Sequence, residues 1–167
     1  MDNLTLLVKA REMAQYMIDH KFKYSNSNVR TNWADAKKTK ITNCSASVCY
    51  CLQEMGVLKK NQRFWGNSND SITYLGTNTK ATILKHYKLI KVGKRPKDYK
   101  KHLRAGDICF YHLHTNIFAG INKEGKMIFW DFGKASTDTK KSGGTFCNIH
   151  RAENPSQKIT YILRYKG

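Results

Sequence analysis

The residues of this chain that could do chemistry together are a cysteine, a histidine and an aspartate. Asn43 is a preferred N-cap residue, and it directly precedes Cys44. The helix that starts there is predicted to run to about Met55, because Gly56 follows as a stop signal. The first turn of a helix stabilises a thiolate and offers N–H groups to an oxyanion. Packing in the core is nevertheless the ordinary role of a single cysteine, so a nucleophile also needs a base.

The histidine and the aspartate lie on two strands of a predicted hairpin. If residues 122–125 form the hairpin loop, Ile121 faces Lys126. Continuing that register makes His114 and Asp131 diagonal neighbours on one face, within side-chain reach. A slip of one residue would place them on opposite faces of the sheet. The hairpin therefore predicts an imidazole that a carboxylate orients.

Together the three residues predict covalent catalysis through a thioester. Cys44 attacks a carbonyl carbon, and His114 takes the thiol proton or rests as an imidazolium beside the thiolate. His114 then protonates the leaving amine and later activates water, while Asp131 holds the ring in place.

Helices are expected first along the chain. Residues 4–19 have the apolar spacing of an amphipathic helix. Residues 21–42 show little periodicity and are expected to form a long polar connection, of a kind that is often functional. The helix from residue 44 to 55 follows, and shorter helices are expected at 70–75 and 79–86.

Strands are expected in the second half, at residues 108–111, 115–121, 126–132 and 159–165. Helices followed by strands indicate an α+β domain with an antiparallel sheet. The length suits one domain over residues 1–167.

Four segments resemble the motifs of NlpC-type peptidases and the related CHAP amidases. Residues 42–56 resemble their nucleophile helix, and residues 103–111 resemble the Gly-Asp pair that leads into a strand. Residues 114–120 resemble the catalytic-histidine strand, and residues 129–133 hold the position of the third catalytic residue. The order of cysteine, histidine and polar orienter matches these families.

This resemblance implies a papain-like fold, with N-terminal helices packed on a central antiparallel sheet, and peptidoglycan as the substrate. It also implies an oxyanion role for Tyr24, although the glycines that usually follow are absent here. Asn43 stands where these families commonly have aspartate. Asp131 stands where NlpC-type enzymes more often have histidine and CHAP enzymes have asparagine or a carboxylate.

Tyr24, Asn43 and Trp65 are the expected oxyanion-binding or substrate-binding residues. Phe64 and Trp65 are aromatic residues in a polar stretch, where they either line a cleft or cover the edge of the core.

The charge of the chain predicts a polyanionic partner. Thirty Lys and Arg against 12 Asp and Glu give a net charge of +18. Such a field attracts nucleic acid, membrane surfaces or anionic wall polymers. The lysines are scattered, which indicates a generally basic surface without a groove-reading helix. Because of this charge, a nucleic-acid-binding module is the alternative to an enzyme. It leaves the cysteine, histidine and aspartate unexplained. A papain-like acyltransferase or deamidase that acts on proteins is a second alternative.

No metal and no cofactor is expected. His112 and His114 are two apart on a strand, which would place them on one face, and Cys147 with His150 forms a second possible pair. Structural zinc sites usually show two clean ligand pairs, and this spacing fits poorly. Five cysteines cannot form a complete disulfide framework, so free thiols are expected. Four of them are expected to be small core residues: Cys49, Cys51, Cys109 and Cys147.

No apolar stretch is long enough for a transmembrane segment, and no signal peptide is visible. With the free thiols, the small size and a peptidoglycan substrate, these features predict a monomeric phage endolysin; a bacterial enzyme exported by another route is the alternative. Such an endolysin is made in the host cytoplasm and reaches the cell wall through a membrane breach. Its basic surface would bind the wall in the absence of a separate binding module.

Overall fold

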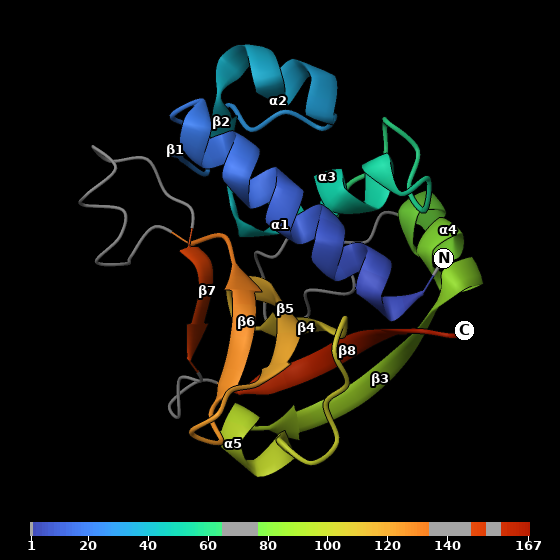
Figure 1. Cartoon of the computed structure of the whole chain (residues 1–167). Helices are drawn as coiled ribbons and strands as arrows, with labels where there is room; N and C mark the ends of the chain where they lie inside the picture. Colours follow the sequence, from blue (N-terminus) through green and yellow to red (C-terminus); the bar gives the residue numbers. More distant parts are fainter. Residues whose placement is uncertain (1, 65–76, 134–147, 153–157) are drawn as a thin grey trace.

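The computed structural model describes residues 2–64, 77–133, 148–152 and 158–167 (Figure 1). The helices are α1 (Asn3–Asp19), α2 (Trp33–Thr39), α3 (Cys44–Glu54), α4 (Thr77–His86) and α5 (Pro96–Tyr99). The strands are β1 (Lys23–Tyr24), β2 (Ile41–Thr42), β3 (Tyr87–Lys94), β4 (Ile108–Tyr111), β5 (His114–Ile121), β6 (Met127–Asp131), β7 (Asn148–Ala152) and β8 (Ile159–Tyr165).

The centre of the fold is a six-stranded sheet in the order β3-β8-β4-β5-β6-β7, in which all neighbouring strands are antiparallel. Figure 1 shows α1, α2 and α3 together at one end of this sheet and α5 at the other end. The α+β class with an antiparallel sheet is confirmed. Among the described residues, no helix combines the length and apolar content needed to cross a membrane.

Helix α1 forms where the apolar periodicity predicts it. Asp2 caps its start, and Thr5 completes a capping box by bonding back to the Asp2 backbone. The buried stripe of the helix consists of Leu6, Ala10, Met13, Ala14 and Met17. These side chains recur at three- and four-residue spacing, so one face of α1 packs into the core.

Helix α3 is buried on every side for most of its length. All nine residues from Cys44 to Leu52 are buried, and the helix packs between α1 and β5. Small side chains allow this close approach, and Cys49 and Cys51 are among them as fully buried free thiols. Cys109 is likewise a buried core residue on β4, whereas Cys147 lies outside the described residues. Burial of this kind holds the first turn of α3 against the sheet.

The prediction of an unstructured connection over residues 21–42 is wrong. This stretch contains β1, α2 and β2, and β1 pairs with β2 in parallel. Asn32 caps α2, and Lys40 ends it in the left-handed conformation at φ 54°. Elements of two to seven residues are too short to produce a readable period, which is why the sequence pattern missed them.

Other elements were also missed or shifted. The strand β3 at the sheet edge, the short helix α5 and the strand β7 were not expected. Lys88, Lys91 and Lys94 of β3 are exposed and do not alternate with buried residues, so the strand lacks a strong hydrophobic pattern. Helix α4 begins at Thr77, two residues before the predicted start. The helix expected at 70–75 lies outside the described residues.

The Gly-Asp pair before β4 has a structural role. Gly106 has a φ of +90°, and a Cβ atom there would lie 2.6 Å from the carbonyl oxygen of Asn3. The buried carboxylate of Asp107 accepts hydrogen bonds from Arg164 Nε at 2.9 Å and Nη2 at 2.7 Å. It also accepts one from the Arg104 N–H at 2.8 Å. This motif therefore joins the start of β4 to α1 and β8.

Candidate functional site

Cys44 is the first residue of α3. The Asn43 side chain caps the helix by accepting a hydrogen bond from the Ala46 N–H at 2.9 Å. Cys44 is only 5% exposed. The N–H groups of the first helical turn have no partner within the helix and point out of its start, beside the thiol.

The β5–β6 hairpin brings His114 and Asp131 together by a different register from the one expected. Ile121 pairs with Met127, one residue beyond the predicted Lys126. A β-bulge between Phe118 and Gly120 then shifts the pairing back by one residue, so Ile117 pairs with Trp130. The predicted alignment is thereby restored at the end of the hairpin that carries the two side chains.

His114 and Asp131 form a direct contact. His114 Nε2 lies 2.5 Å from Asp131 Oδ1, and Asp131 is fully buried. His114 is the first residue of β5 and Asp131 is the last residue of β6. Because the two strands are antiparallel, both residues lie at the same end of the strand pair. Figure 1 shows this end of β6 pointing toward α1. Because Nε2 faces the carboxylate, Nδ1 is the ring nitrogen left for the thiol of Cys44.

The thiol of Cys44 is surrounded by hydrogen-bond donors. Burial raises the pKa of the thiol, but the hydrogen bond and charge of His114, the N–H of Thr115 and the hydroxyl of Tyr24 lower it. Together these hydrogen bonds and the charge of His114 outweigh the effect of burial, and the pKa of Cys44 lies below its ordinary value. The site therefore favours the thiolate, which is the nucleophilic form of cysteine.

The pKa of His114 is shifted in the opposite direction from that of Cys44. Burial lowers the pKa of His114, but hydrogen bonds to Asp131 and Cys44 and the charges of both raise it from 6.5 to about 9. His114 is thus an imidazolium at neutral pH. The lowered pKa of Cys44 and the raised pKa of His114 both favour a thiolate–imidazolium pair, with Asp131 behind the ring.

Tyr24 lies beside this pair, as the oxyanion assignment requires. It comes from β1, and its hydroxyl is hydrogen-bonded to the side chain and the backbone N–H of Cys44. Burial and the negative charges of Cys44 and Asp131 raise the pKa of the Tyr24 hydroxyl well above its ordinary value. The hydroxyl therefore keeps its proton and remains a donor.

Asn43 and Trp65 are the other two residues predicted to bind substrate or oxyanion. Asn43 Oδ1 is committed to the helix cap and to Ser45 Oγ at 3.2 Å, and Nδ2 donates to Asn26 at 3.4 Å. Its side chain therefore supports the helix start. Trp65 lies outside the described residues. Phe64 is fully buried and packs edge-on against Phe110, so it belongs to the core.

Sequence reasoning missed two residues that the fold brings to Cys44. Thr115 contributes a backbone N–H, which depends on no side-chain type and leaves no signal in the sequence. Arg63 is 6% exposed and bonds the cap residue Asn43. An arginine in a polar loop is ordinarily a surface residue, so its burial could not be anticipated.

His112 does not share a face with His114. Tyr111 pairs with His114, so His112 and Leu113 form a two-residue turn between β4 and β5. Leu113 has a φ of 61°, and His112 is exposed. Within the ranges that the structure describes, no three His, Cys, Asp or Glu side chains are grouped as a metal site would require.

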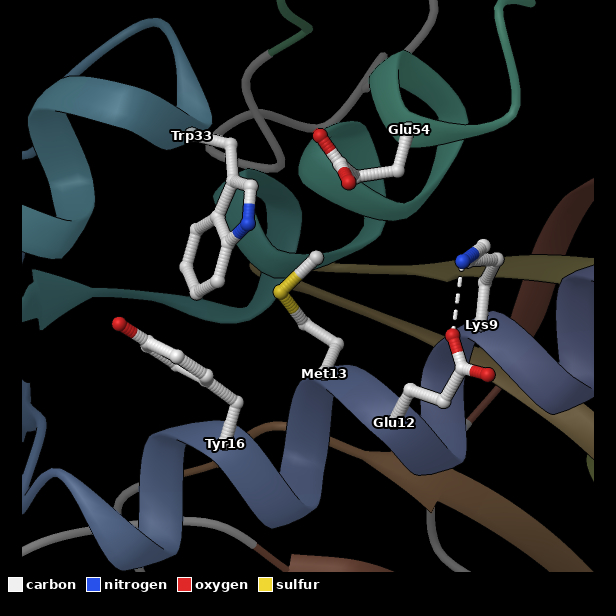
Figure 2. Close-up of a pocket in the computed structure, with 6 residues that line it drawn as sticks. All are labelled: Lys9, Glu12, Met13, Tyr16, Trp33 and Glu54. Carbon is white, nitrogen blue, oxygen red and sulfur yellow. Dashed lines mark hydrogen bonds and ion pairs between the residues drawn. The ribbon is translucent and has the colours of Figure 1, made fainter.

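A separate hollow of about 130 Å³ lies between α1, α2 and α3 (Figure 2). The described residues around it are Lys9, Glu12, Met13, Tyr16, Trp33 and Glu54, and the Lys9 ammonium pairs with Glu12 at 2.7 Å. Glu54 ends α3 and Cys44 begins it, so the two are about 15 Å apart along the helix axis. The hollow is therefore distinct from the Cys44 site.

No family model, no curated protein and no solved structure matches the chain. The likeness to NlpC-type and CHAP enzymes thus rests on the motif residues, and the papain-like topology stays a prediction.

Proposed function

We propose that the chain is a papain-like cysteine hydrolase that cleaves peptide or amide bonds of bacterial peptidoglycan. The observation that carries the proposal is the continuous contact from Cys44 through His114 to Asp131. A buried cysteine alone would be a core residue, whereas a thiolate paired with an imidazolium on a buried carboxylate is an activated nucleophile.

The acylation step starts from the ion pair. The Cys44 thiolate attacks the carbonyl carbon, and the carbonyl π electrons move to oxygen to give a tetrahedral oxyanion. When the oxyanion collapses, the bond to nitrogen breaks and the His114 imidazolium gives its proton to the leaving amine. A thioester to Cys44 and a neutral imidazole remain.

Deacylation returns the enzyme to its starting state. Neutral His114 accepts a proton from water, and the resulting hydroxide attacks the thioester carbonyl. The thiolate leaves beside the imidazolium, and a carboxylic acid is released. Asp131 keeps the ring oriented through both steps and stabilises the cation.

The oxyanion of both steps would lie between two donors that already meet at Cys44. One is the hydroxyl of Tyr24, which burial keeps protonated. The other is the backbone N–H of Cys44 at the start of α3, where the helix dipole favours negative charge. Before substrate binds, the Cys44 N–H donates to the Tyr24 oxygen and the Tyr24 hydroxyl donates to the thiol, so an oxyanion that forms beside them would take over both donors.

Peptidoglycan is the proposed substrate because of the motif order and the charge. Residues 42–56 and 103–133 carry motifs similar to those of wall hydrolases, and the net charge of +18 suits the anionic polymers of a bacterial wall. We further propose a phage endolysin that is made in the host cytoplasm and acts on the wall as a monomer.

Digestion of purified peptidoglycan tests the function. Wild-type protein is expected to clear a wall suspension and release fragments whose new termini, read by mass spectrometry, identify the bond cut. Cys44→Ala is the control, because it removes the sulfur and leaves the rest of the site. Intact peptidoglycan after incubation with folded wild-type protein would refute the proposal.

The same experiments separate the alternatives. A protein-directed acyltransferase or deamidase would show a reactive Cys44 but leave walls intact. In a nucleic-acid-binding module, Cys44 would not be alkylated selectively near neutral pH. All the cysteines would then react at similar, slow rates. Lysis by a charge-guided hydrolase should fall steeply with added salt. A flat salt response would count against the basic surface as the wall-binding device.

A further inference from the structure

Arg63 is a buried cation next to the start of the nucleophile helix. Only 6% of the residue is exposed. Its Nη2 donates to Asn43 Oδ1 at 3.3 Å, and its Nη1 donates to the carbonyl oxygens of Val29 and Arg30, both at 3.4 Å. The guanidinium thus joins the α3 cap to the segment before α2.

The acceptors of Arg63 are themselves parts of the site framework. Asn43 Oδ1 also accepts the cap hydrogen bond from Ala46 N–H at 2.9 Å, so Arg63 fixes the side chain that begins α3. The Arg30 carbonyl also accepts a hydrogen bond from the Tyr50 hydroxyl on α3 at 2.5 Å. Arg63 therefore restrains α3 at its first residue, where Cys44 lies.

The charge of Arg63 also reaches the thiol. Burial lowers the pKa of Arg63, and the negative charges of Cys49, Tyr50 and Cys44 act in the opposite direction. Cys49 and Tyr50 have pKa values that burial raises, so both are neutral at physiological pH. Cys44 is the member of this group that the site ionises.

When Cys44 is a thiolate, the charges of Cys44, His114 and Asp131 sum to one negative charge, and among the described residues Arg63 is a buried cation close to them. The Cys44 thiolate and the Asp131 carboxylate carry two negative charges, and the His114 imidazolium carries one positive charge. A buried excess charge is costly when nothing compensates it. The guanidinium of Arg63 brings the sum to zero.

We propose that Arg63 is a positioning residue for the reaction, which holds the Asn43 cap and supplies a buried positive charge that favours the Cys44 thiolate. This inference rests on the proposed function, because it concerns the same nucleophile. Arg63 contacts the helix cap, and its effect on the chemistry passes through Cys44.

The test is the pH dependence of Cys44 alkylation by iodoacetamide, with the modified residue identified by peptide mass spectrometry. Arg63→Gln keeps an amide that can donate to Asn43 but removes the charge, whereas Arg63→Lys keeps the charge. The thiolate midpoint should rise by about 0.5 pH unit in Arg63→Gln, less than the loss of a donor in direct contact with the sulfur would cause, and stay near the wild-type value in Arg63→Lys. The charged and titratable described groups around the thiol are His114 from β5, Tyr24 from β1, Cys49 from α3, Arg63, and Asp131 behind His114.

A folded Arg63→Gln protein with the wild-type midpoint would overturn the proposal. If that variant does not fold, Arg63→Met takes its place as a neutral variant: a raised midpoint supports the charge effect, and the wild-type midpoint refutes it. The result is separable from the proposed function. A wild-type midpoint at the ordinary value of a free thiol would remove the nucleophile assignment, whereas a lowered wild-type midpoint that the neutral Arg63 variant leaves unchanged removes only the role of Arg63.

Discussion

Replacing Asp131 by asparagine should lower the pKa of His114 while leaving the ring oriented. The asparagine side chain retains an oxygen that can accept the hydrogen bond now made to His114 Nε2 at 2.5 Å, but it carries no charge. The wild-type pKa of His114 is about 9 rather than 6.5, a difference worth roughly 3 kcal/mol in favour of the imidazolium. A neighbouring carboxylate commonly accounts for about 1 to 2 pH units of such a rise. We therefore expect the midpoint in Asp131→Asn to lie well below 9.

Stability supplies a second measure with a defined sign. The folded-state pKa of His114 is raised, so its stabilising contribution is fully present below about pH 6.5 and is lost as the pH rises through about 9. Asp131→Asn should consequently destabilise the protein by about 2 kcal/mol at pH 6. The difference should shrink as the pH approaches 9. Urea denaturation at several pH values gives these free energies of unfolding.

NMR titration of the His114 Cε1–H signal measures the midpoint directly, and His114→Gln assigns the signal. Asp131→Ala is the companion variant, because it removes the acceptor as well as the charge. Its kcat on peptidoglycan should fall below that of Asp131→Asn, since the ring then loses its orientation. An Asp131→Asn protein whose His114 still titrates near 9 would refute the view that the carboxylate raises this pKa.

Three further substitutions test individual contacts. Tyr24→Phe should lower kcat about 100-fold with little change in KM, because it removes a donor to the oxyanion; steady-state kinetics that show a change in KM alone would contradict this. Asp107→Ala leaves the largely buried Arg164 guanidinium without its carboxylate and should cost about 3 kcal/mol in urea unfolding, while Cys44 alkylation in the folded protein keeps its midpoint. Gly106→Ala should lower the melting temperature, since a Cβ atom would lie 2.6 Å from the Asn3 carbonyl oxygen at a φ of +90°; an unchanged melting temperature would show that the backbone there adjusts freely.

Local patterns in the sequence were sufficient for the elements that hold Cys44, His114 and Asp131, but not for β1, which carries Tyr24. Cap residues and apolar spacing predicted α1 and the start of α3, because a helix with one buried face repeats at a period that can be read along the chain. Short strands bounded by a turn signal predicted the β5–β6 hairpin. The contact between His114 and Asp131 followed from that hairpin, since both residues lie on neighbouring strands.

The register of the β5–β6 hairpin was predicted only in part. The predicted loop was wrong by one residue, and the bulge between Phe118 and Gly120 restored the alignment that brings His114 to Asp131. Gly120, at a φ of 144°, lies at this bulge, and a single glycine inside a strand is a local signal for one, whereas the residues of the turn carry no such signal. The predicted register is therefore wrong next to the loop, where Ile121 pairs with Met127, and right beyond the bulge, where Ile117 pairs with Trp130.

Tertiary structure alone decided what surrounds the thiol of Cys44. The sequence placed Cys44 at a helix start, but its donors come from β1 and β5, and the buried guanidinium of Arg63 comes from the loop after α3. Contacts between segments so far apart depend on how helices pack against the sheet, which no local period records. The sequence by itself thus predicted the candidate nucleophile and its base, whereas the packing determined the surroundings that lower the pKa of Cys44 and raise that of His114.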